Sequence, residues 1–198
     1  MSVFQWPPEN CNPLLLQIGR IILNFNTMEN SVKSLLWAVS SQSDYVEHRA
    51  LVIHMQNVTL CDAILTIANE KVEMGAMKSE TRDLISHCIK TFNLTREYRN
   101  WYVHGFNGVM TNGDGQIYTH SARSRLAEHY VPITAKDAKW LADWCFEGSH
   151  YLATSYGYVA RDMGHNIGGV QTPLPDKWPL PNKLKKPLRH HLYAKGSP

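Results

Sequence analysis

The sequence predicts a mainly α-helical fold, a four-helix bundle with a small β-hairpin inserted after the third helix. Apolar residues recur at helical spacing over long stretches, and tight-turn residues concentrate in one internal segment. A length of 198 residues with 43% hydrophobic content suits a single domain. We therefore expect a helical domain over residues 1–170, with extended structure at about 107–133, and a Pro-rich basic tail over residues 171–198.

The first helix is predicted to begin at Pro13 and to run to about Ser41. Asn12 is a favourable N-cap residue, and proline fits the first helical position. Apolar residues then follow every three or four positions, which is the pattern of one buried stripe. They are Leu14, Ile18, Ile21, Phe25, Met28, Val32, Leu35 and Val39. The stripe suits a bundle helix or a dimer seam, and the length of the chain favours the bundle.

The second helix is predicted to run from Asp44 to about Glu73, with an irregularity near Asn57. Asp44 and Glu47 fit a capping box, and Gly75 is a residue that commonly ends helices. Its buried side is expected to hold five aliphatic residues. They are Val46, Ile53, Leu60, Ile64 and Ile67.

The third helix is predicted to begin at Ser79 and to end before Gly105. Glu80 in its first turn favours the positive end of the helix dipole. Its stripe begins with apolar residues and continues with Arg96 and Arg99. The helix face therefore changes from apolar to cationic toward its C-terminal end.

Residues 107–133 show no helical period. The run Thr111–Gln116 is rich in Gly, Asn and Asp and predicts a tight turn, so we expect a small β-hairpin or three short strands. Thr134 and Asp137 form a capping box for the fourth helix, which glycines from Gly164 onward would end. Its inner side is predicted to hold Ala138, Leu141, Cys145, Gly148, Leu152, Ser155 and Val159.

Charge is unevenly distributed along the chain. Residues 171–198 carry six basic residues against Asp176 alone, a charge of +5, so the rest of the chain is −2 when the total is +3. Two interpretations remain open. The tail is a basic arm that contacts the phosphates of a nucleic acid, or it is an extended segment that wraps its own domain or a partner subunit, with Trp178 and Leu180 as anchors.

Composition excludes several classes of protein. Six Trp, nine Tyr and five Phe can fill a core, which argues against wholesale disorder. No apolar run reaches the roughly 18–20 residues of a membrane span, and the first ten residues lack a signal-peptide pattern. The four cysteines (11, 61, 88 and 145) form no CxxC pair, so we interpret them as reduced core thiols of a cytoplasmic protein.

Residues 96–105 hold the one group of side chains that suggests chemistry. On a helix, Arg96, Asn100 and His104 lie at i, i+4 and i+8 and line one side. Arg99 and His104 are separated by about 140° around the helix axis, so we expect them to converge on a ligand rather than to contact each other.

Cleavage of RNA is the reaction that these residue types fit. A neutral histidine can accept the proton of a 2′-hydroxyl, and a protonated one can donate to the leaving 5′-oxygen. Arginine matches the extra negative charge of the transition state. One histidine cannot be acid and base at once, so a symmetric dimer that supplies two is expected.

A structural role is the alternative for the same residues. Arg99 would then pair with a carboxylate of a neighbouring helix, and protonated His104 would be stabilised by the helix dipole. The protein would in that case be a non-catalytic interaction or nucleic-acid-binding module. The other histidines suggest no strong metal site, although His120 and His129 could face each other across two strands.

The segment Arg99-Asn100-Trp101-Tyr102-Val103-His104 resembles the Arg-x(4–6)-His motif of the HEPN superfamily. The similarity covers roughly residues 80–160 and includes Gly105 after the histidine, the turn at residues 113–115 and the helix that begins after Thr134. The chain departs from the family in one respect, because residues 107–133 insert extended structure directly after the motif.

The resemblance implies a four-helix bundle that dimerises around the motif. Catalytic members are metal-independent endoribonucleases that leave a 2′,3′-cyclic phosphate, and they occur as toxins and in phage or stress defence. Carried over by position, Arg99 and His104 would be catalytic and Asn100 supporting, and we expect Arg96, Arg123 and Arg125 to contact the substrate. The implied partners are RNA, a second copy of the chain and an antitoxin or regulatory protein, with no metal, cofactor or membrane.

Overall fold

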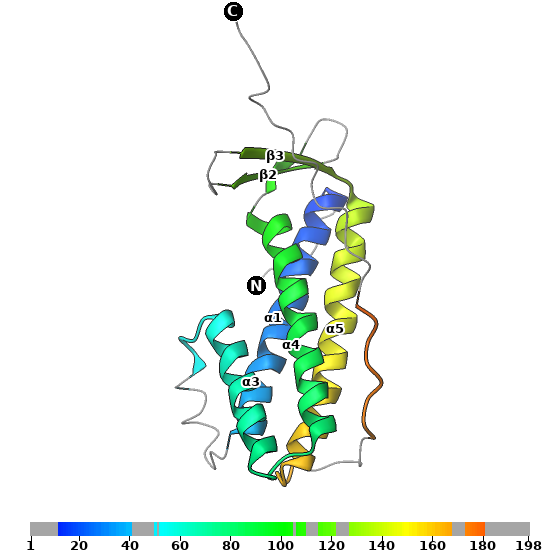
Figure 1. Cartoon of the computed structure of the whole chain (residues 1–198). Helices are drawn as coiled ribbons and strands as arrows, with labels where there is room; N and C mark the ends of the chain where they lie inside the picture. Colours follow the sequence, from blue (N-terminus) through cyan, green and yellow to red (C-terminus); the bar gives the residue numbers. More distant parts are fainter. Residues whose placement is uncertain are drawn as a thin grey trace, which may run out of the picture. The chain divides into compact units, whose positions relative to one another are not determined.

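The computed structural model describes residues 12–40, 50, 52–104, 106–109, 115–121, 127–167 and 173–180. Figure 1 shows the helices and strands along the chain. Four long helices are present among these residues: α1 (Pro13–Val39), α3 (Asn57–Glu73), α4 (Ser79–His104) and α5 (Ala135–Asp162). The predicted mainly helical fold with four helices is confirmed.

The chain divides into two compact units. The first unit comprises Met1–Leu23, Arg96–Trp144 and Pro181–Pro198, and the second comprises Asn24–Thr95 and Cys145–Leu180. Helices α1, α4 and α5 contribute residues to both units, whereas all of α3 belongs to the second.

The core of the second unit contains segments of all four helices. Phe25 of α1 stacks on Phe92 of α4, with ring centroids 5.2 Å apart. At the other end of α4, the Thr81 hydroxyl donates to the Asp162 carboxylate of α5 over 2.6 Å. The side-chain amide of Asn57 in α3 donates to Glu29 of α1 over 3.4 Å. Stacked rings and buried polar contacts thus join the helices in pairs.

Helix α1 follows its prediction closely. Asn12 Oδ1 accepts a hydrogen bond from the Leu14 amide over 2.8 Å, which is the expected N-cap contact. Every residue of its predicted stripe is buried, with Ile18 at 9% the most exposed of them. Full burial of one such aliphatic or aromatic side chain contributes roughly 1.5–3 kcal/mol, so this stripe is a large part of the driving force for folding.

The second predicted helix is interrupted next to Asn57, where an irregularity was expected. Residues 53–56 are not helical and α3 begins at Asn57, so one continuous helix from Asp44 to Glu73 is excluded. Ile53, expected on the buried side, is 66% exposed because it lies in this break. Leu60 and Ile64 are buried as predicted, whereas Asp44, Val46 and Glu47 lie outside the described residues.

Three strands separate α4 from α5, where the sequence left open a hairpin or three strands. They are β1 (Phe106–Val109), β2 (Gly115–Ser121) and β3 (Ala127–Ile133), paired antiparallel in the order β1-β2-β3. The register pairs His120 with Glu128 and His129 with Thr119. The expectation that His120 and His129 face each other is therefore wrong.

Helix α5 also matches its prediction. The Thr134 hydroxyl accepts from the Asp137 amide over 3.2 Å, and Asp137 Oδ2 accepts from the Thr134 amide over 3.0 Å, which completes the capping box. All of its predicted inner residues are buried. Gly164 follows its C-terminus at φ +80°, a left-handed conformation that glycine adopts without strain.

Cys61, Cys88 and Cys145 are buried thiols, as predicted, and Cys11 lies outside the described residues. Burial raises the pKa of Cys88 to about 11, although hydrogen bonds from Ser155 and Tyr151 oppose the shift. Within the described part of the chain, no helix combines the length and hydropathy that crossing a bilayer requires.

Candidate functional site

The last turns of α4 present two different faces in the first unit. Tyr98 and Tyr102 are at most 6% exposed and anchor one face in the core. Asn100 and His104 are exposed on the other face. Because apolar contacts hold the first face, the polar side chains of the second are presented on a fixed helical framework.

The two residues at the ends of the motif contact each other directly. Arg99 Nη1 lies 2.8 Å from His104 Nε2 and 3.2 Å from Asn100 Oδ1. The expectation that Arg99 and His104 would not touch is therefore wrong. The angle of about 140° separates their Cα positions, but the long arginine side chain reaches across the last turn to the imidazole.

The contact defines the protonation state of His104 in this arrangement. Arginine has only N–H donors and stays protonated, so His104 Nε2 must be the acceptor. The imidazole is consequently neutral, with its proton on Nδ1. A doubly protonated imidazole has no lone pair, so protonation of His104 would break its hydrogen bond to Arg99.

Tyr102 is excluded as a general base beside the motif. Burial raises its pKa to about 12, and the negative charge of Asp137 adds to the shift. The phenol is therefore protonated at neutral pH. His104 is therefore the candidate proton acceptor of the motif.

The predicted substrate-binding arginines are only partly described. Arg96 lies on α4 one turn before Asn100 and is half-buried. Arg123 and Arg125 lie outside the described residues, as does Gly105. The structure therefore brings together Arg99, Asn100 and His104, while the contribution of the other arginines stays a prediction.

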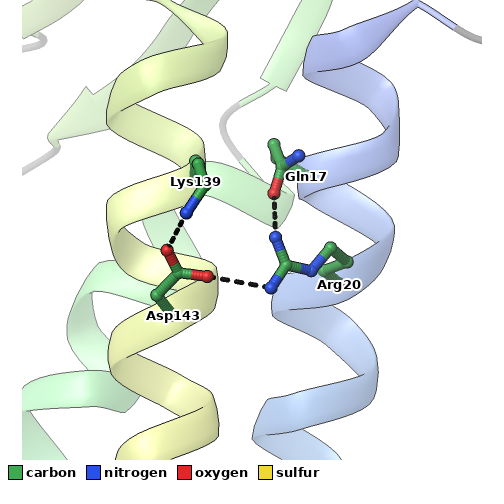
Figure 2. A network of polar contacts seen from close by, with 4 residues as sticks. All are labelled: Gln17, Arg20, Lys139 and Asp143. Carbon is green, nitrogen blue, oxygen red and sulfur yellow. Dashed lines mark hydrogen bonds and ion pairs between the residues drawn. The ribbon is translucent and has the colours of Figure 1, made fainter.

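A second polar cluster in the first unit was not predicted from the sequence. Figure 2 shows Arg20 of α1 between Gln17 of its own helix and Asp143 of α5. Arg20 Nη2 donates to Asp143 Oδ1 over 2.8 Å, and Lys139 donates to the other carboxylate oxygen. The spacing of Lys139 and Asp143 is a local signal, but nothing in the sequence pairs them with a residue more than a hundred positions away.

The two cations determine the charge state of Asp143. Its hydrogen bond from Lys139 lowers the pKa of the carboxyl, partial burial opposes this, and Arg20 lowers it further. Asp143 is thus ionised near neutral pH and ties α1 to α5. We assign this cluster a structural role, because the carboxylate engages both cations.

Among the described residues, no three His, Cys, Asp or Glu side chains are grouped so that they could hold a metal ion. Comparisons of the chain with protein-family models, curated proteins and solved structures found no match. Function is therefore inferred from the geometry of α4 and from the motif itself.

Proposed function

We propose that the protein is a metal-independent endoribonuclease of the HEPN type, acting as a toxin or defence effector. One observation carries this proposal: the neutral His104 imidazole and the Arg99 guanidinium lie in contact on the exposed end of α4, beside Asn100. In this proposal a proton acceptor, a phosphate-binding cation and a polar support lie within about one and a half helical turns.

The reaction begins with the 2′-hydroxyl of the RNA itself. His104 accepts the hydroxyl proton while the 2′-oxygen attacks the adjacent phosphorus, and the bond from phosphorus to the 5′-oxygen breaks. The products are a 2′,3′-cyclic phosphate and a 5′-hydroxyl. Arg99 binds the phosphate oxygens and stabilises the added negative charge of the transition state, for which its planar guanidinium is well suited.

Substrate binding and base activation are coupled in this scheme. In the free protein, Arg99 donates to the Nε2 lone pair that a general base would use. When Arg99 turns to a phosphate, Nε2 of His104 becomes free to accept the 2′-hydroxyl proton. Asn100 provides a neighbouring polar side chain that supports the motif. His104 cannot also protonate the 5′-oxygen at the same moment, so a second copy of the chain would provide that histidine in a cytoplasmic homodimer.

Labelled single-stranded RNA incubated with the purified protein in EDTA tests the proposal. We expect cleavage to cyclic-phosphate ends in EDTA, and a loss of at least about 10²-fold in His104→Ala and Arg99→Ala, because each removes a group that acts in the transition state. Loss of activity in EDTA, or full activity of His104→Ala, would contradict it.

Arg20→Ala is the matched control. It removes an arginine of the same unit whose partner is a carboxylate, so cleavage should persist while stability falls slightly. Circular dichroism of each variant checks that the helices remain. A loss of cleavage as large in Arg20→Ala as in Arg99→Ala would show that the assay reports folding rather than chemistry.

A non-catalytic nucleic-acid-binding module is the second candidate. The observation that favours it is the hydrogen bond from Arg99 to Nε2, because this contact occupies the base in the free protein. The module predicts RNA binding that weakens in Arg99→Ala, with no cyclic-phosphate product at any protein concentration. Filter binding and product analysis on the same samples separate the two candidates.

A further inference from the structure

Residues 173–180 form an extended strap in the second unit, without regular secondary structure. Pro173 and Leu174 at its start are exposed, and so are Asp176 and Lys177. Trp178 is half-buried, and its backbone and ring make the specific contacts of the strap. The strap is therefore held mainly through one residue.

The site that receives Trp178 is built from α1, α4 and α5. A Cβ atom placed on Gly148 of α5 would lie 2.8 Å from Trp178 Cζ3 and 3.0 Å from Met28 Cε of α1. The indole ring thus lies where any larger residue at position 148 would project. Gly148, predicted on the inner side of this helix, thus makes room for an indole.

Two further residues fix the orientation of Trp178. The Nε2–H of His87 donates to the Trp178 carbonyl over 2.8 Å, so the backbone of the strap is held at α4. The centroid of the Tyr151 ring lies 6.1 Å from that of the Trp178 indole. It lies 5.9 Å from the centroid of the His87 imidazole, in an edge-to-face arrangement. Shape, an aromatic neighbour and one backbone hydrogen bond thus converge on a single residue.

The rest of the strap is less closely packed. A cavity of about 240 Å³ lies between residues 174–177 of the strap and Glu80 and Leu84 of α4. Segments with few buried contacts open at a lower free-energy cost than the core does. We therefore expect the strap to leave its site at a lower free-energy cost than unfolding of the helices of the second unit requires.

We infer that Met28, His87, Gly148 and Tyr151 form a binding site for the indole of an extended, proline-flanked peptide, and that residues 173–180 are its ligand in cis. Trp178 lies between Lys177 and Pro179, and Pro175 precedes them, so the ligand is already biased toward an extended backbone. Tethering gives the strap a local concentration on the order of millimolar, which keeps the site occupied. The inference is independent of the proposed nuclease.

Peptide complementation tests the site in the full chain. Trp178→Ala removes the ligand side chain but none of the residues that form the site. A fluorescently labelled synthetic peptide of residues 173–180 should bind this variant, which a rise in the fluorescence anisotropy of the peptide would show. It should bind the wild type about tenfold more weakly, because the tethered strap competes at its high local concentration.

Gly148→Ala provides the variant that separates binding from folding. Alanine is the better helix former, so α5 should be no less helical. Its Cβ would displace the indole, so the strap should be cleaved faster by protease and the double variant with Trp178→Ala should not bind the peptide. Equal peptide binding by Trp178→Ala with glycine or alanine at position 148, or no binding by Trp178→Ala alone, would overturn the inference.

Discussion

Two arginines of the first unit show how partners decide what a cation can do. Arg20 donates to the Asp143 carboxylate of another helix, and Lys139 shares the same carboxylate. Arg99 contacts an amide and an imidazole of its own helix, and both of these partners are neutral. The first arrangement joins two helices of the fold, whereas the second brings a guanidinium, an amide and an imidazole together at the exposed end of one helix.

The sharpest test of this comparison exchanges arginine for lysine at both positions. In Arg99→Lys the planar fork that fits phosphate is replaced by a point charge, so RNA cleavage should fall by about 10²-fold. Arg20→Lys keeps a cation beside Asp143 and should leave cleavage unchanged. Single-turnover rates with the same RNA measure both effects, and equal losses would remove the distinction between the clusters.

The second prediction concerns Asp162, an ion-paired carboxylate of the second unit. Burial opposes its ionisation, but the hydrogen bonds from Thr81 and Lys78 outweigh burial and lower its pKa. Asp162→Asn should therefore reduce the free energy of unfolding by about 1–2 kcal/mol at neutral pH, since a charged hydrogen-bond acceptor is lost. Urea unfolding followed by circular dichroism measures the change.

Acid should reduce the difference between wild type and Asp162→Asn. The folded pKa lies below the unfolded value of about 3.9, so the stabilisation is complete above that value and is lost as pH falls through the folded pKa. The two stability curves should run parallel above about pH 5 and converge toward pH 3.

Asp143→Asn should have the smallest effect. Its side chain and that of Arg20 are each 37% exposed, so solvent screens the pair and its loss should cost about 0.2–1 kcal/mol. The salt dependence of unfolding provides the check, because the difference from wild type should shrink at high ionic strength. An effect larger than that of Asp162→Asn would mean that the surface cluster is a main support of the fold.

Capping residues and apolar periodicity in the sequence were sufficient to predict α1 and α5. Asn12 and Thr134 cap α1 and α5 as their side-chain chemistry predicts, and the stripes of both helices are buried. The irregularity expected near Asn57 is a break at residues 53–56, and it leaves Ile53 exposed although this residue fits the helical period. Periodicity alone does not show which residues a break removes from the helix.

The candidate site was predicted by residue type but not by contact. The position of Arg99 and His104 on one helix follows from the sequence, whereas their hydrogen bond depends on side-chain length, which an angular argument omits. The contacts between Arg20 and Asp143 and between Trp178 and Gly148 join distant segments, and no local pattern encodes them.

The buried cysteines give the second unit its own reporter. Cys61, Cys88 and Cys145 all belong to that unit and are at most 2% exposed. With its pKa near 11, the Cys88 thiol is almost entirely protonated at neutral pH and is a poor nucleophile while buried. Alkylation of these three thiols therefore requires the helices around them to separate. The alkylation rate thus reports how often the second unit opens, without an introduced label.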